Sequence, residues 1–258
     1  MTHMKWIAAI SLFAGPALAA PAPGVTWDWQ LSEPIKPPQV AVFDTDPDSV
    51  SAAQIARLNA AGAYKICYVS VGTLEDYRDD IADFPAEVIG KTYGDWPDER
   101  FLDIRRADVL APLMKARFAR CADMGFDAIE PDNLDVYQNA SGFEISAQDT
   151  VKYVSILAHM AHEMGLEIGQ KNVPELTPAL IDQMNFAITE SCHQDGWCNQ
   201  IAAYTAAGKP VFDAEYTDRA LNLTRACAQA ATLGISMILK DRDLTASRKT
   251  CPQQEPSL

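Results

Sequence analysis

Carboxyl groups stand directly after two of the short apolar runs in this sequence. Ile129-Glu130-Pro131-Asp132 and Ile188-Thr189-Glu190 each carry an acidic side chain where an apolar segment ends. Two carboxyl groups that flank one bond can divide the work of cleaving it, one as general acid and the other as nucleophile or base. Asp132 and Glu190 are therefore among the candidates for catalytic chemistry.

Other apolar runs end in residues of the same polar kind. The further candidates for ligand binding are Asp44, Tyr68, Glu130, Asn133, Asp135, Lys171, Asn172, Glu215 and Tyr216. Any single acid among them could instead cap a helix or occupy a turn, because Asp and Asn are favoured at both. As a group they suit a sugar ligand, whose hydroxyls need many directional hydrogen-bond partners.

The elements that must position these residues alternate between strand-like and helix-like segments. Eight β-branched or aromatic runs predict strands at Val40–Asp44, Tyr64–Ser70, Phe101–Ile104, Asp127–Glu130, Glu167–Gln170, Phe186–Glu190, Pro210–Ala214 and Ser236–Lys240. Amphipathic stretches predict helices at Ser49–Ala61, Asp108–Met124, Ala147–Met164, Pro174–Met184, Cys198–Ala207 and Arg219–Thr232. Strands that alternate with helices indicate a parallel sheet.

Glycines punctuate this pattern at the predicted helix ends. Each could cap a helix shortly before the next strand: Gly62, Gly125, Gly165, Gly208 and Gly234. Eight repetitions without a long break favour an α/β fold of the (β/α)8 TIM-barrel type, in which the active site lies at the carboxyl ends of the strands. A doubly wound sheet is the second choice, although the chain has no glycine-rich nucleotide-binding motif.

The N-terminal segment reads as a secretory leader. Lys5 precedes an apolar run from Trp6 to Ala14, and Ala17-Leu18-Ala19 has the small-x-small form of a cleavage site. The run is too short to span a bilayer, which takes ~20 residues. We therefore expect a signal peptide at residues 1–19, a single barrel domain at residues 20–258, and a secreted or periplasmic protein.

Six cysteines in an exported chain suggest disulfide bonds rather than a metal site. Cys192 and Cys198 are the safest pair, because a short loop that contains Gly196 separates them. Cys227 with Cys251, and Cys67 with Cys121, would complete the set. Six cysteines nevertheless allow fifteen connectivities, and sequence alone does not select one.

The charge of the chain bears on its partners. A formal net charge of −14 disfavours nucleic acid and anionic lipid, and favours a neutral or cationic ligand. His159 and His162 are expected to pack or face solvent, and Asp44, Asp46 and Asp48 lack the spacing of a calcium loop. We expect no metal, no cofactor, no membrane partner and a monomer.

Several segments together resemble glycoside hydrolase family 114. They are Gly125-Phe126-Asp127-Ala128-Ile129-Glu130-Pro131-Asp132-Asn133-Leu134-Asp135, Cys67-Tyr68-Val69-Ser70-Val71-Gly72, Ile168-Gly169-Gln170-Lys171-Asn172, Ile188-Thr189-Glu190-Ser191-Cys192 and Lys209-Pro210-Val211-Phe212. The resemblance runs from about Trp27 to Lys240. It implies an endo-α-1,4-polygalactosaminidase on a barrel fold, an exopolysaccharide substrate that contains galactosamine, and catalysis by Asp132 and Glu190. A de-acetylated galactosamine polymer is cationic, which agrees with the acidic chain.

The division of roles stays open at this point. We favour Asp132 as nucleophile and Glu190 as general acid/base, but the reverse is consistent with the sequence. Glu130 could tune the pKa of Asp132, since residues two apart on an extended segment point the same way. Glu215 could replace Glu190, because a glutamate after strand seven serves as nucleophile in other barrel glycosidases. Alternatives for the whole protein are a carbohydrate-binding barrel without turnover and a metal-dependent hydrolase.

Overall fold

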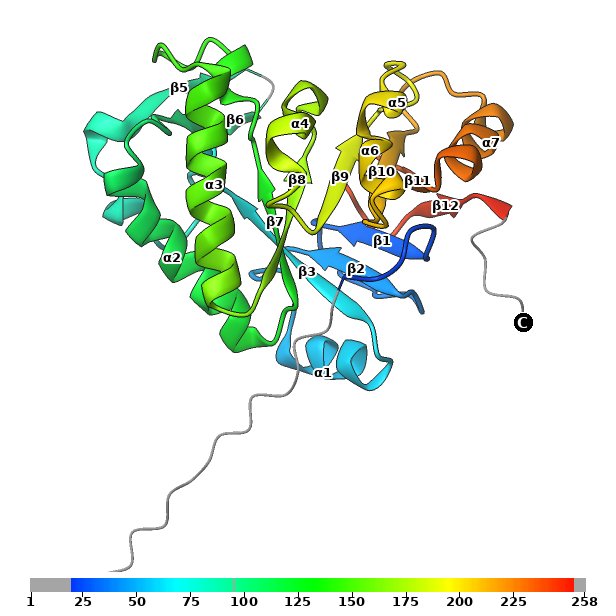
Figure 1. Ribbon diagram of the computed structural model, residues 1–258. Coiled ribbons are helices and arrows are strands. Elements are labelled where there is room, and N and C mark those ends of the chain that lie inside the picture. Colours follow the sequence, from blue (N-terminus) through cyan, green and yellow to red (C-terminus); the bar gives the residue numbers. More distant parts are fainter. Residues whose placement is uncertain (1–19, 95, 253–258) are drawn as a thin grey trace, which may run out of the picture.

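The computed structural model describes residues 20–94 and 96–252, and its centre is a sheet of parallel strands (Figure 1). In their order around the sheet, the strands are β1 (Trp27–Gln30), β2 (Val42–Thr45), β3 (Tyr64–Ser70), β7 (Ala128–Asp132), β8 (Glu167–Lys171), β9 (Phe186–Glu190), β10 (Val211–Tyr216) and β11 (Ser236–Lys240). Each is parallel to its neighbour. This arrangement confirms the predicted barrel.

Side chains connect the two edge strands and nearly close the barrel. Lys240 Nζ on β11 lies 3.1 Å from Asp28 Oδ1 on β1. The short strand β12 (Arg248–Thr250) runs antiparallel to β11, and Arg248 donates to the carbonyl of Trp27 at 2.6 Å. The buried Lys240–Asp28 ion pair thus takes the place of a backbone ladder between the first and eighth strands.

One predicted barrel strand is wrong and one was missed. Phe101–Ile104 does not enter the barrel, because its first two residues end β6 (Trp96–Leu102). This strand pairs antiparallel with β4 (Thr73–Glu75) and β5 (Ile89–Tyr93) in a separate sheet. The first barrel strand is instead β1, in a segment for which no strand was predicted. The two errors cancel in the count, so β7 is still fourth and β9 still sixth.

Helices cover the outside of the sheet (Figure 1). They are α1 (Ala52–Ala60), α2 (Ala107–Met124), α3 (Ala147–Glu163), α4 (Thr177–Leu180), α5 (Cys198–Ile201), α6 (Ala203–Ala206) and α7 (Leu223–Leu233). The 3-10 turns are η1 (Ile81–Asp83), η2 (Ala86–Val88), η3 (Val136–Gln138) and η4 (Pro174–Leu176). Ser51 and Ser146 form capping boxes at the starts of α1 and α3. Gly125 and Gly234 end α2 and α7 with left-handed backbone, as predicted. The helices expected at Pro174–Met184 and Cys198–Ala207 are shorter and broken.

Two hydrophobic cores lie on the two faces of the sheet. The barrel interior holds an aromatic cluster that includes Trp27, Trp29, Phe186 and Phe212, while the larger core packs strands against helices. Because side chains alternate along a strand, each strand-end residue faces either the mouth of the barrel or the outer shell. This alternation decides which predicted site residues can meet.

The pairing of the cysteines agrees with an exported protein. The structure confirms all three predicted disulfides, Cys67–Cys121, Cys192–Cys198 and Cys227–Cys251. Such bonds are typical of proteins outside the cytoplasm. None of the helices in residues 20–94 and 96–252 has the length and apolarity to cross a membrane. The predicted signal peptide lies outside the described residues.

Candidate active site

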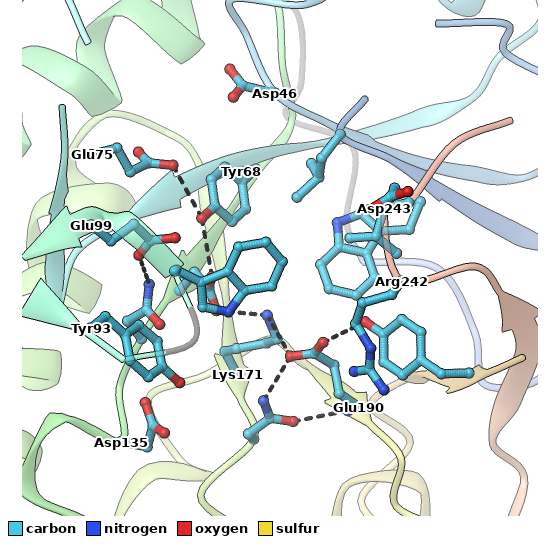
Figure 2. A pocket seen from close by; sticks show the side chains of 18 of the residues that line it. Asp46, Tyr68, Glu75, Tyr93, Glu99, Asp135, Lys171, Glu190, Arg242 and Asp243 are labelled. Atoms are coloured by element: carbon cyan, nitrogen blue, oxygen red, sulfur yellow. Dashed lines mark hydrogen bonds and ion pairs between the residues drawn. The ribbon is translucent and has the colours of Figure 1, made fainter. Parts of the chain in front are cut away.

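A cavity of about 510 Å³ opens at the carboxyl ends of the barrel strands (Figure 2). Strands β3, β7, β8, β9 and β10 supply one part of its wall, and the small β4–β6–β5 sheet supplies another. Eight of the predicted site residues line it: Tyr68, Asp132, Asn133, Asp135, Lys171, Asn172, Glu190 and Tyr216. The barrel therefore gathers most of the predicted site in one place.

Lys171 lines this cavity and contacts three carboxyl groups. Its Nζ lies 2.6 Å from Asp132 Oδ1, 3.0 Å from Glu130 Oε1 and 3.3 Å from Glu190 Oε2. The ammonium also sits 4.7 Å from the centre of the Trp29 ring, a cation–π distance. Burial disfavours the charged lysine, but Asp132, Glu130 and Glu190 outweigh it and raise the pKa of Lys171 well above its ordinary value.

The shared lysine limits the separation of the two candidate catalytic groups. Asp132 Oδ1 and Glu190 Oε2 can be no farther apart than their two distances to Nζ combined, which is about 6 Å. Both side chains keep some exposure to the cavity, 19% for Asp132 and 27% for Glu190. The two groups are thus close together and open to a ligand.

Hydrogen-bond donors orient both carboxylates. Tyr68 donates its hydroxyl to Asp132 Oδ2 at 3.1 Å. Tyr216 donates to Glu190 Oε1, and Asn172 Nδ2 donates to Glu190 Oε2 at 3.1 Å. Burial opposes ionisation of Glu190, yet Lys171, Tyr216 and Asn172 together lower its pKa. These three partners therefore hold Glu190 as a carboxylate.

The backbone takes an unusual conformation directly after each of the three central residues. Asn133, Asn172 and Ser191 have φ of 62°, 49° and 56°, in the left-handed region that non-glycine residues seldom adopt. The turn at Asn172 lets its Oδ1 accept the backbone N–H of Glu190 at 2.9 Å. Such strain gathers at functional sites, where the surrounding structure holds it in place.

Three predicted binding residues do not reach the cavity. Asp44 and Glu130 are fully buried beneath Lys171. Glu215 is also fully buried, and it accepts the backbone N–H groups of His193 at 2.6 Å and Gln194 at 3.0 Å. Its neighbour Tyr216 faces the barrel interior, so alternation turns Glu215 to the outer shell. Glu215 therefore cannot replace Glu190 at the mouth.

Comparison with protein families identifies the family of this chain. The model of glycoside hydrolase family GH114 matches residues 9–255. The chain belongs to family GH114. The crystal structure of Aspergillus fumigatus Ega3 in complex with galactosamine is similar with a TM-score of 0.81 and 30% sequence identity, over 92% of this chain and 100% of that one.

Two more distant relatives extend the comparison of the GH114 chain. The glycoside hydrolase domain of PelA from Pseudomonas aeruginosa has a TM-score of 0.67 and 16% identity, over 87% of this chain and 98% of that one, which shows the shared fold. An uncharacterized protein of Deinococcus radiodurans is 25% identical over 226 residues, or 78% of this chain and 71% of that protein. The barrel fold is thus shared with the PelA domain.

Sequence reasoning missed several residues that line the GH114 cavity. The small sheet contributes Glu75, Tyr93, Trp96 and Glu99, and β1 contributes Trp29. The only sequence signal was the alternation Trp27-Asp28-Trp29-Gln30, which fits a half-buried strand. The small-sheet segments are short and polar, so no periodic pattern marks them.

The cavity is strongly acidic. Nine of its lining residues are acidic and three are basic. In the described part of the chain no cation pairs with Asp98, Glu99, Asp135 or Asp243, whereas Arg219 pairs with Asp195 and Arg242 with Asp218. Burial and neighbouring carboxylates, notably Asp132, raise the pKa of Glu99 to about 7. Figure 2 shows Glu99, Tyr93 and Asp135 on the side opposite Arg242.

One cluster of potential metal ligands lies outside this cavity. Among the described residues, Cys192, Cys198, Asp213 and Glu215 bring their ligand atoms within 4.8 Å of one another. The two sulfur atoms, however, form a disulfide. Glu215 accepts two backbone N–H groups. These contacts explain the cluster without an ion.

Proposed function

We propose that this GH114 protein is an exported glycoside hydrolase that cleaves α-1,4-linked, galactosamine-containing polysaccharide within the chain. The observation that carries the proposal is the arrangement of Asp132 and Glu190 around Lys171 at the mouth of the barrel. Family GH114 membership gives the reaction class. No described residue other than these two combines a carboxyl group, contact with Lys171 and exposure to the cavity.

The spacing supports a retaining mechanism. Retaining enzymes separate their two carboxyl groups by ~5–5.5 Å, whereas inverting enzymes need ~6.5–9.5 Å for a water molecule between them. The two oxygens that share Lys171, Asp132 Oδ1 and Glu190 Oε2, are at most about 6 Å apart, which is closer to the retaining spacing than to the middle of the inverting range. One carboxylate would attack the anomeric carbon, and the other would protonate the leaving oxygen and then activate water.

We assign Asp132 as the nucleophile and Glu190 as the general acid/base. Asp132 makes the tighter contact with the ammonium of Lys171, 2.6 Å against 3.3 Å for Glu190, and a close cation favours a charged nucleophile. Glu190 is the more exposed of the two and lies beside the open rim. The lowered pKa of Glu190 suits the base half of the cycle. The acid half requires that a bound sugar displace one of its three donors.

The acidic lining supports an amino-sugar substrate. Unpaired carboxylates such as Glu99 and Asp135 attract the ammonium groups of a de-acetylated galactosamine polymer. Tyr93 and the half-exposed Trp96 offer aromatic faces beside them, and sugar rings pack on such faces. The likeness to Ega3, which binds galactosamine in its crystal structure, points to the same class of ligand.

Variants at three positions test the site with polygalactosamine as substrate. Asp132→Asn and Glu190→Gln should each reduce release of reducing ends from polygalactosamine at least about 1,000-fold without changing the melting temperature by much. Glu215→Gln is the matched control, and it should keep the chemistry. Azide should restore turnover of Glu190→Ala with retained configuration and give an inverted product with Asp132→Ala.

Product length and substrate choice separate the finer claims. Internal cleavage should yield a ladder of oligosaccharides, whereas release of monomer alone would overturn the endo-acting assignment. Activity confined to neutral or N-acetylated polymers would overturn the amino-sugar assignment. Binding of polygalactosamine without any cleavage would instead indicate a carbohydrate-binding barrel, and loss of activity with a chelator would indicate a metal-dependent enzyme.

A further inference from the structure

Two carboxyl groups beneath the cavity have no part in the reaction proposed above. Asp44 on β2 and Glu130 on β7 are both 0% exposed. No hydrogen-bond donor of the described residues reaches either carboxyl oxygen of Asp44. Glu130 Oε1 lies 3.0 Å from Lys171 Nζ, neither Glu130 oxygen has a hydrogen-bond partner among the described residues, and the Glu130 and Asp44 side chains lie close enough to share a proton.

Two such groups cannot both be ionised. A buried carboxylate without a donor costs several kcal/mol, and two that face each other repel. One shared proton removes both problems, because the acid then donates to the carboxylate. The carboxylate should be Glu130, since only Glu130 also contacts the ammonium of Lys171.

We propose that Asp44 is a protonated positioning residue: its O–H donates to the Glu130 carboxylate, which in turn holds the Lys171 ammonium between Asp132 and Glu190. This inference rests on the proposed function for its catalytic consequence. The protonation of Asp44 itself does not depend on that function.

The charges around the pair agree with this distribution. Burial, and then the neighbouring Glu130, raise the pKa of Asp44 well above its ordinary value. Burial also raises the pKa of Glu130, but Lys171 limits the rise to about 7. The other charged or titratable groups that face the cluster are Tyr68 (β3), Asp132 (β7), Glu190 (β9) and Tyr216 (β10), with Asp28 and Lys240 paired to each other on β1 and β11. The proton therefore resides on Asp44 when Glu130 is ionised.

Glu130 moderates the pull of Lys171 on the catalytic groups. When Glu130 is ionised, its negative charge partly offsets the positive charge of Lys171. Without that charge, Lys171 would stabilise the ionised form of Glu190 more strongly, and the pKa of Glu190 would fall. The pair thus sets the pH range in which Glu190 can carry a proton.

Kinetics of three variants test the proposal. Glu130→Gln keeps the shape and removes the charge, so the basic limb of the kcat–pH profile, which follows Glu190, should move to lower pH by about one unit. Asp44→Val removes the donor and should lower kcat about tenfold or more with little change in KM. Asp44→Asn keeps a neutral donor and should rescue most of that loss, to within about threefold of the parent protein.

A spectroscopic readout needs no substrate. Infrared difference spectra between the parent protein and Asp44→Asn, recorded at a pH above 8, should contain the C=O band of one protonated carboxyl group. A difference is needed because burial and Glu215 also raise the pKa of Asp213 well above its ordinary value. Melting temperatures of all variants identify any that fail to fold.

Each outcome decides the proposal. Loss of the carboxylic-acid band in Asp44→Asn together with kinetic rescue supports it. The proposal is overturned if no band is lost, or if Asp44→Asn is as damaged as Asp44→Val, because Asp44 would then be needed as an anion. If the parent protein cleaves no amino-sugar polymer, the proposed function fails while the infrared result still reports on Asp44.

Discussion

Tyr216 at the end of β10 donates its hydroxyl to Glu190 at the end of the neighbouring strand β9. The guanidinium of Arg242 lies over the same phenol ring, 3.6 Å from its centre. Tyr216 takes one carboxylate oxygen, and Asn172 and Lys171 take the other. Both oxygens of Glu190 are therefore fixed before any ligand arrives.

Replacing this hydroxyl should change the pH range of the enzyme. The Tyr216 O–H stabilises the ionised form of Glu190, so Tyr216→Phe should raise the pKa of Glu190 and move the basic limb of kcat to higher pH. The lost charge-assisted hydrogen bond should also cost about tenfold in kcat. Tyr137→Phe, which removes a hydroxyl from Glu175 outside the cavity, is the matched control. An unmoved limb would argue against Glu190 as the acid.

Lys171→Met should damage both stability and catalysis. The substitution leaves Glu130 and Asp132 without their cation, which should cost about 3–5 kcal/mol of unfolding free energy and at least about 100-fold in kcat. Lys65→Met is the control, because Lys65 forms an equally buried ion pair with Asp127 at the other end of β3. Chemical denaturation should report a loss for both variants, and kcat a loss for Lys171→Met alone.

Glu99 should make the protein less stable as the pH rises towards neutrality. Its folded pKa of about 7 lies above the ordinary value of 4.5, so the folded state favours the protonated form. Stability is then greatest below pH 4.5 for this group and falls between pH 4.5 and about 7. Glu99→Gln should raise the melting temperature by about 2–4 °C at pH 8. The gain should vanish at pH 4, and a gain that is equal at both pH values would contradict this assignment.

The Cys192–Cys198 disulfide should support activity as well as stability. It closes the loop that begins at Ser191 and brings the N–H groups of His193 and Gln194 onto Glu215. Replacing both cysteines with serine should cost about 2 kcal/mol from loop entropy, and kcat should also fall. The Cys227–Cys251 pair is the control, since it joins α7 to the C-terminal segment away from the cavity. Its removal should reduce stability with kcat unchanged.

The sequence by itself determined the barrel and predicted a mouth rich in carboxyl groups, and the family resemblance singled out Asp132 and Glu190 among them. Period-two apolar runs, helix-length amphipathic stretches and glycines such as Gly125 are local signals, because each depends on backbone geometry within a few residues. The order of the strands around a parallel barrel then follows from chain order. That is enough to bring Asp132 and Glu190 to one mouth.

Only the tertiary structure decided which neighbours share that mouth. Glu215 and Tyr216 are adjacent in sequence, but only Tyr216 of these two faces the barrel interior. Trp96 and Glu99 reach the cavity through the antiparallel pairing of β6 with β4, a contact between segments more than twenty residues apart. The position of Lys171 between three carboxylates likewise depends on three strands at once. Local patterns cannot specify such contacts, because they arise from the register and facing of strands that meet only in the folded barrel.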